Sequence, residues 1–109
     1  MAELTVATEQ DGADVVVSVG GDLDYDSHGR LERAVDAALD GAPARLVLDL
    51  TAVTYCDSCG LRVLLGAHHR AGEVGATFVL RGVQGQPARA LRLTGLDQVL
   101  SACEQKEGR

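Results

Sequence analysis

Along the chain, segments with the hydrophobic pattern of β-strands are followed by segments in which apolar residues recur at helical spacing. Residues 4–8 alternate weakly, as in a first strand, and residues 10–13, which contain Asp-Gly, predict a hairpin turn into a second strand over residues 14–19. Residues 46–50 and 76–81 are short and mostly apolar, as in strands of a buried sheet. Four strands are therefore predicted along the chain.

Between and after these strands, apolar residues recur at helical spacing. The first helix is predicted to begin at Ser27, whose hydroxyl would cap it, and to stop at a left-handed Gly41 before Pro43. A second helix is predicted over residues 58–71 and a third over residues 86–94. The apolar faces of the first two helices comprise Leu31, Val35, Ala38 and Leu39, and Leu61, Leu64, Leu65 and His68.

The predicted order of elements is β-β-α-β-α-β-α. Residues 97–100 would add either a short last strand or a single helical turn, and Gly20-Gly21 is predicted to end the second strand. Strands 46–50 and 76–81 are joined through a helix, so they should be parallel with a right-handed crossover, whereas the hairpin is antiparallel. The sequence thus predicts an α/β protein with a mixed sheet of four to five strands and helices packed against it.

Composition narrows the class of protein. A length of 109 residues predicts a single domain over 1–109, with a frayed polar tail from about residue 104. The net charge of −6 argues against nucleic acid as a partner. The lack of an apolar run of about 18 residues argues against a membrane span, and without a signal-peptide pattern a cytoplasmic location is expected. Three cysteines, an odd number, favour reduced thiols.

Ser58 stands where a predicted strand passes into a predicted helix, in the run Tyr-Cys-Asp-Ser-Cys-Gly-Leu from residue 55. A hydroxyl at a helix start can cap the free backbone N–H groups. A phosphoryl group at the same place would meet those N–H groups and the positive end of the helix dipole. From the residues alone, Ser58 is either a structural cap or a switch.

Four short motifs give this chain a family resemblance that spans nearly its whole length. They are Gly21-Asp22-Leu23-Asp24, Leu48-Asp49-Leu50, Asp57-Ser58-Cys59-Gly60-Leu61 and Leu93-Thr94-Gly95-Leu96. In this order and at these separations the chain resembles the STAS domain of bacterial anti-sigma factor antagonists. Cys59 departs from the resemblance, since Ser or Thr is usual there.

The resemblance implies a non-enzymatic switch without a cofactor of its own, acting in transcription regulation by partner switching. In its dephosphorylated form it would bind an anti-sigma factor serine kinase and so release a sigma factor. The kinase, using its own ATP and Mg²⁺, would phosphorylate Ser58, and a PP2C-type phosphatase would reset it. The partner-binding residues implied in this way are Asp22, Asp24, Asp57, Ser58, Cys59, Gly60 and Arg62.

Two other functions stay open. The chain could be a STAS subunit or scaffold of another assembly, in lipid transport or stress signalling, without a phospho-switch. It could also be a thiol oxidoreductase, because Cys56 and Cys59 form a C-x-x-C run at a helix start. Against this, Asp57 beside the thiols disfavours a thiolate, and we expect both cysteines to be buried, structural and not disulfide-bonded. No second pair of ligands accompanies them for zinc.

Overall fold

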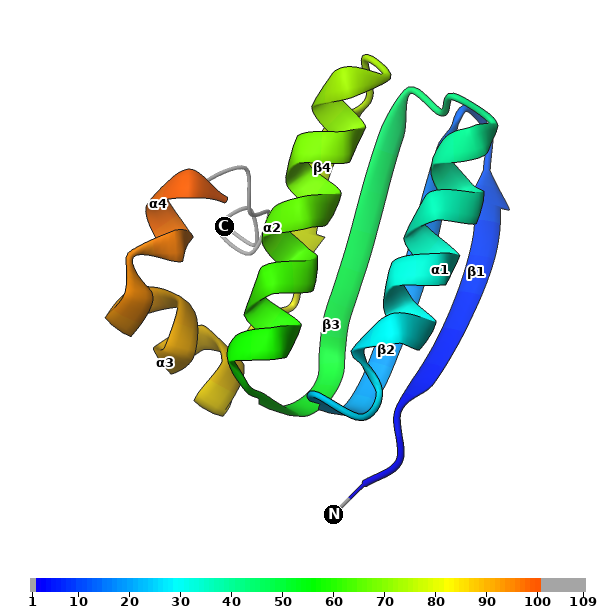
Figure 1. Ribbon diagram of the computed structural model, residues 1–109. Helices are drawn as coiled ribbons and strands as arrows, with labels where there is room; N and C mark the ends of the chain where they lie inside the picture. Colours follow the sequence, from blue (N-terminus) through cyan, green and yellow to red (C-terminus); the bar gives the residue numbers. More distant parts are fainter. Residues whose placement is uncertain (1, 101–109) are drawn as a thin grey trace.

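A computed structural model describes residues 2–100 of the chain (Figure 1). The predicted order of elements is confirmed, and residues 97–100 belong to a last helical turn and not to a fifth strand. The predicted polar tail lies outside the described residues. The elements are β1 Thr5–Asp11, β2 Asp14–Leu23, α1 His28–Asp40, β3 Arg45–Cys56, α2 Ser58–Glu73, β4 Thr77–Arg81, α3 Gly85–Thr94 and α4 Leu96–Val99.

The four strands form one sheet in the order β1-β2-β3-β4. β1 and β2 are an antiparallel hairpin, while β2 with β3 and β3 with β4 are parallel, as predicted. Helices α1 and α2 lie side by side on one face of the sheet, and α3 and α4 lie beyond α2 (Figure 1). Among residues 2–100, no helix combines the length and the apolar character that a bilayer crossing requires.

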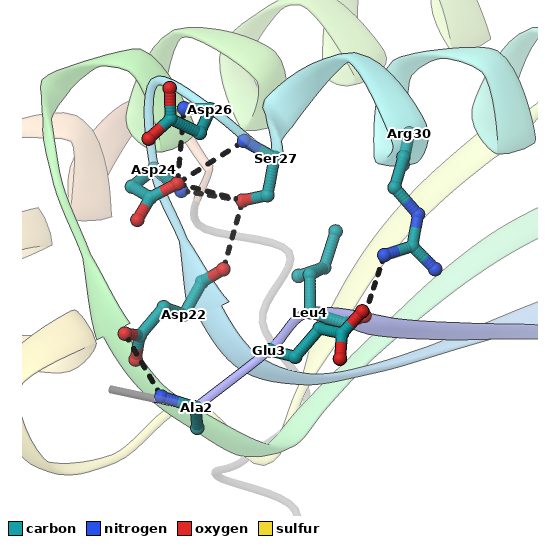
Figure 2. A pocket seen from close by; sticks show the side chains of 8 residues that line it. All are labelled: Ala2, Glu3, Leu4, Asp22, Asp24, Asp26, Ser27 and Arg30. Carbon is teal, nitrogen blue, oxygen red and sulfur yellow. Dashed lines mark hydrogen bonds between the residues drawn. The ribbon is translucent and has the colours of Figure 1, made fainter.

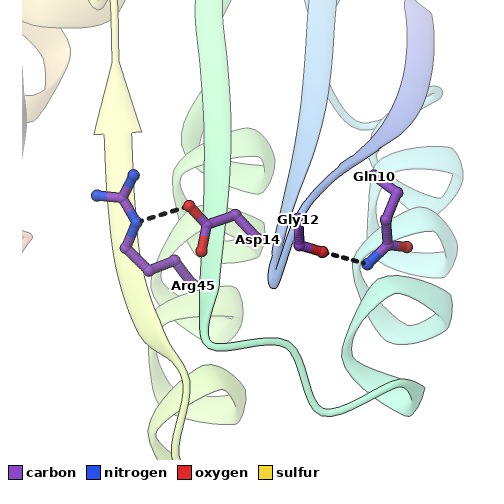
Figure 3. Close-up of polar contacts among 4 residues, drawn as sticks. All are labelled: Gln10, Gly12, Asp14 and Arg45. Atoms are coloured by element: carbon purple, nitrogen blue, oxygen red, sulfur yellow. Dashed lines mark hydrogen bonds and ion pairs between the residues drawn. The ribbon is translucent and has the colours of Figure 1, made fainter.

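The core lies between the sheet and the two long helices. Alternate residues of β3 point into it, and Leu46, Leu48 and Leu50 are at most 1% exposed. The predicted apolar face of α1 is confirmed, because all four of its residues are buried. On the other face of the sheet, Arg45 pairs with Asp14 on the neighbouring strand at 3.1 Å (Figure 3).

Two local predictions are wrong. Gly20-Gly21 does not end β2: the strand continues to Leu23 through two register shifts, between Ser18 and Gly20 and between Gly21 and Asp22. Gly21 takes φ +83°, and a Cβ there would collide with the carbonyl of Glu3, so the glycine permits an irregular strand and not a stop. The extension puts Leu23 opposite Cys56, at the end of β3.

The end of α1 also differs from the prediction. Gly41 has φ −84°, and the left-handed residue is Ala42 with φ 49°. The Ala42 N–H donates to the Leu39 carbonyl at 2.9 Å, in a tight turn that follows the helix. The helix stops at Gly41 as predicted, and only the left-handed conformation lies one residue later.

Candidate functional site

The candidate site lies where β2 and β3 end side by side. Because the two strands are parallel, their carboxyl ends reach the same edge of the sheet, with Leu23 in register with Cys56. The Asp57 N–H donates to the Leu23 carbonyl at 3.2 Å and so fastens the turn into α2 to the end of β2. The loop into α1 and the start of α2, which carries Ser58, are therefore neighbours at this edge (Figure 1).

Asp57 caps α2. Its Oδ1 accepts hydrogen bonds from the backbone N–H groups of Cys59 at 2.9 Å and Gly60 at 3.1 Å. Its Oδ2 accepts from the backbone N–H of Tyr25, across the site, at 3.1 Å. One carboxylate thus accepts hydrogen bonds from two N–H groups of the first helical turn that have no partner within the helix, and from one N–H group of the loop.

Ser58 follows this cap as the first residue of α2. Its side chain is exposed and makes no hydrogen bond to any residue between 2 and 100. The interpretation of Ser58 as a structural cap is therefore wrong, because the preceding residue holds that position. The hydroxyl stands free at the start of a 16-residue helix.

Gly60 allows the close approach on which this arrangement depends. A Cβ at this position would lie 2.6 Å from the Leu23 carbonyl oxygen and 2.7 Å from the Cys56 sulfur. Only a residue without a side chain lets the first turn of α2 sit this close to the end of β2.

The loop between β2 and α1 is held by its own side chains (Figure 2). Oδ1 of Asp24 accepts from the N–H groups of Asp26 at 3.1 Å and Ser27 at 3.2 Å. The Ser27 hydroxyl accepts from the Asp24 N–H at 3.0 Å and lies 2.9 Å from the Asp22 carbonyl, to which it can donate. Ser27 is the N-cap of α1, as predicted, but its hydroxyl forms hydrogen bonds within the loop and accepts none from the N–H groups of the helix.

Asp22 joins three segments of the chain. Its Oδ1 accepts from the Thr54 hydroxyl at 3.2 Å, and its Oδ2 accepts from the Ala2 N–H at 3.3 Å. Beside it is a hollow of about 470 Å³ between the N-terminal segment and the start of α1 (Figure 2). The hollow is lined by Ala2, Glu3, Leu4, Asp22, Asp24, Asp26, Ser27 and Arg30.

The structure thus brings most of the predicted partner-binding residues to one edge. Asp57 links the start of α2 to the loop that contains Asp24, and Asp22 lies at the root of that loop. Arg62 is exposed one turn along α2 from Ser58, and it makes no ion pair with any residue in the described range 2–100. Its side chain is therefore available to an anion on this surface.

The two thiols at the site differ. Cys56 is 2% exposed, and burial, with a smaller contribution from the charge of Asp57, raises its pKa to about 12. Cys59 is only half-buried, which corrects the prediction that both would be mostly buried. Both are free in the structure. A thiol with a raised pKa is a poor nucleophile at neutral pH, which argues against an oxidoreductase.

No metal site accompanies these thiols: residues 2–100 contain no cluster of three or more His, Cys, Asp or Glu side chains that could hold a metal ion. His68 is half-buried, as predicted, with its ring edge-on to Phe78 at 5.6 Å between centroids.

Sequence reasoning missed two residues of the site. The Gln86 amide accepts from the Cys56 N–H at 2.8 Å and donates to the Cys56 carbonyl at 3.0 Å, which ties the start of α3 to the end of β3. Tyr25 was also missed, although the residue is 71% exposed and its N–H bonds Asp57. A glutamine before a proline carries no known signal, whereas a lone tyrosine in an acidic loop could have been noticed.

The fold and the motif at Ser58 together define a known class of domain. A family model described as "Mlab, STAS domain" matches residues 6–101. The chain belongs to the STAS domain family.

Its relatives include anti-sigma factor antagonists. The anti-sigma-F factor antagonist RsfB of Mycobacterium tuberculosis is 32% identical over 96 residues, which are 87% of this chain and 77% of that protein. The anti-sigma-B factor antagonist of Bacillus subtilis is 28% identical over 96% of this chain and 95% of its own. A crystal structure of an anti-sigma factor antagonist from Mycobacterium paratuberculosis superposes with a TM-score of 0.83 at 32% identity, over 90% and 83% of the two chains.

Proposed function

We propose that this protein is an anti-sigma factor antagonist that binds an anti-sigma factor serine kinase while Ser58 is unmodified. Phosphorylation of Ser58 by that kinase ends the binding, and a PP2C-type phosphatase restores it. The observation that carries the proposal is the free, exposed hydroxyl of Ser58 directly after the true cap of α2. Because Asp57 already performs the structural task, Ser58 can be modified without unfolding the helix start.

The electrostatics of the site support such a switch. A phosphoserine carries about −1.5 to −2 charges at neutral pH. At Ser58 this charge would stand beside the carboxylate of Asp57, on an edge that also carries Asp22 and Asp24. Docking would have to desolvate the added charge, and like charges brought together at an interface cost several kcal/mol. The modified edge should therefore lose affinity while the fold is kept.

In the proposed cycle, the partners catalyse both the phosphorylation and the dephosphorylation of Ser58. The kinase brings its own ATP and Mg²⁺, and the phosphatase removes the phosphoryl group. Arg62, exposed one turn away, is placed to lie near a phosphate on Ser58 and to neutralise part of its charge. The protein itself contributes the acceptor hydroxyl and the surrounding surface.

Titration calorimetry against the cognate kinase, with ADP or ATP, tests this proposal. Ser58→Ala should bind as the unmodified protein does, and Ser58→Glu should bind about a hundredfold more weakly, or ~2.7 kcal/mol. Circular dichroism should show equal melting temperatures, because an anion is locally favourable at a helix N-terminus. Equal affinities of wild type and both variants would refute the phospho-switch.

A second function keeps one observation in its favour. The matching family model is described as "Mlab, STAS domain", so the match assigns the domain and no particular partner. The protein could then be a STAS subunit or scaffold of another assembly, in lipid transport or stress signalling, in which Ser58 is never phosphorylated. Affinity purification with mass spectrometry of the bound proteins and of the Ser58 peptide separates the two, since only the first predicts a kinase partner and a phosphopeptide.

A further inference from the structure

Tyr25 presents a large side chain to solvent from a loop that is held at several points. The residue is 71% exposed. Its N–H donates to Oδ2 of Asp57 at 3.1 Å, and its carbonyl lies 2.7 Å from Nδ1 of His28. The His28 ring lies 6.0 Å from the Tyr25 ring, between centroids. The ring is therefore displayed from a fixed backbone next to the start of α2.

We propose that Tyr25 is the anchor of the partner-binding surface and that Asp57 is the residue that positions it. The occupant is a protein partner with an apolar pocket for the Tyr25 ring and Lys or Arg side chains around that pocket. This inference rests on the proposed function, because it names the contact through which the unmodified protein binds its kinase.

Rigidity and chemistry both favour Tyr25 in this role. Tyrosine is enriched among the few residues that carry most of the energy of an interface. It offers a large contact area with only two side-chain torsions to fix, and a loop that is ordered before binding loses little entropy. The bonds of Asp57, Asp24 and Ser27 supply that order.

Charge complementarity indicates which residues should surround the partner's pocket. Tyr25 lies between Asp24 and Asp26 in the chain, and the Asp57 carboxylate touches its backbone. The nearby cation Arg30 is turned to the N-terminal segment, where its Nη1 donates to the Leu4 carbonyl at 2.8 Å. An exposed aromatic residue on an acidic loop fits an apolar pocket with a basic border.

The same contact connects Tyr25 to Ser58. A phosphoryl group on Ser58 would stand next to the Asp57 carboxylate and would attract the N–H groups of Cys59 and Gly60, which that carboxylate now binds. Repulsion between the two anions weakens the hold of Asp57 on the Tyr25 N–H. Modification of Ser58 thereby loosens the anchor as well as adding charge to the surface.

The first experiment measures affinity for the kinase that binds the wild-type protein in the calorimetry described above, loaded with ADP. Tyr25→Ala should bind about thirtyfold more weakly, as expected for an anchor residue, and Tyr25→Phe should keep most of the affinity. Leu93→Ala is the matched control: Leu93 is 79% exposed on α3, so its loss should leave affinity within about twofold. Equal affinities of Tyr25→Ala and wild type would overturn the anchor.

The second experiment needs no partner and uses Asp57→Asn. Asn caps helices as well as Asp, so its single oxygen can keep the bonds to Cys59 and Gly60, while its NH₂ group cannot accept from Tyr25. Amide hydrogen exchange at Tyr25 should rise about fivefold, the loss of one hydrogen bond, and exchange at Ser27 should stay unchanged because Asp24 holds it. Ser58→Glu should raise exchange at Tyr25 and the neutral Ser58→Gln should not.

The two experiments separate the possible failures. If the wild-type protein binds no anti-sigma factor kinase, the proposed function fails and the partner of Tyr25 fails with it. If wild type binds and Tyr25→Ala binds equally well, only the anchor fails. If exchange at Tyr25 is the same in wild type, Asp57→Asn and Ser58→Glu, the positioning role of Asp57 is refuted whatever the partner.

Discussion

Two helices begin at the same edge of the sheet, each shortly after a strand, and each start carries a serine beside acidic residues. At the start of α1, the Ser27 hydroxyl is half-buried and bonded to the backbone of Asp24. At the start of α2, the Ser58 hydroxyl is exposed and has no partner within residues 2–100, because Asp57 caps the helix. The same residue type is structural in one place and free in the other.

The difference follows from where each serine stands relative to the N-cap: Ser27 is the N-cap of α1, and Ser58 is the residue after the N-cap of α2. Ser27 precedes its helix and faces the loop, whereas Ser58 follows the cap and faces solvent. A hydroxyl that completes a loop cannot be modified without a cost in stability, while a hydroxyl after the cap can. Whether a serine at a helix start is available for modification is therefore decided by which residue caps the helix.

The glycines of the two helix starts should give the largest contrast. Gly60→Ala should lower the free energy of unfolding by about 3 kcal/mol, because its Cβ would meet the Leu23 carbonyl and the Cys56 sulfur. Gly29→Ala should raise it by about 0.5–1 kcal/mol, since its Cβ would meet only the end of the flexible Arg33 side chain, 3.4 Å away. Urea denaturation measures both, and equal changes would contradict the close packing of α2.

The thiols around the second helix start should give a smaller contrast. Cys56→Ser should cost about 2 kcal/mol, because it places a hydroxyl in an apolar, buried position, and Cys59→Ser should change stability by less than about 0.5 kcal/mol. Alkylation by iodoacetamide at pH 8.5, followed by peptide mapping, should label Cys59 well before Cys56 in the folded protein. Equal labelling would show that Cys56 is not buried.

The raised pKa of Cys56 also predicts a pH dependence. In the unfolded chain the thiol loses its proton from about its ordinary pKa of 9.0, and in the folded protein from about 12. The folded state therefore binds more protons between these values, so stability falls as pH rises through this window. Cys56→Ser should lack this component of the loss.

The serines should give the smallest contrast and the most direct one. Ser27→Ala should lower the free energy of unfolding by about 1 kcal/mol, because the Asp24 N–H loses its acceptor in a half-buried loop. Ser58→Ala should change it by less than about 0.5 kcal/mol. Thermal melts of the two variants at one pH decide the matter, and a larger loss in Ser58→Ala would return Ser58 to a structural role.

The sequence predicted the elements well where periodicity is strong and less well at their junctions. The apolar run of residues 46–50 defines a strand, and the helical repeat of α1 is long enough to define a helix and its buried face. At Gly20-Gly21 the same residue type that ends strands also permits a bulge, and only the pairing with β3 decides between them.

The sequence predicted where the candidate site lies in the fold, but it did not predict the hydrogen bonds that hold the site together. Asp57 and Ser58 are both good capping residues one position apart, so the pattern cannot say which of them caps. The bond from Asp57 to the Tyr25 N–H joins residues 32 positions apart, and no local pattern contains it. The bond between the Gln86 side chain and the Cys56 N–H likewise joins residues 30 positions apart.

The two hydrogen bonds of Gln86 bear on the part of β3 that has no neighbouring strand on one side. β4 pairs with β3 only from Arg45 to Asp49, so the rest of β3 has no strand on that side. Gln84 donates to the Thr51 carbonyl at 3.0 Å, and Gln86 satisfies both backbone groups of Cys56. An open row of N–H and C=O groups is a template on which a second chain can add a strand and start an aggregate. The side chains of Gln84 and Gln86 occupy part of that row, and so they leave fewer free backbone groups on which a second chain could pair with β3.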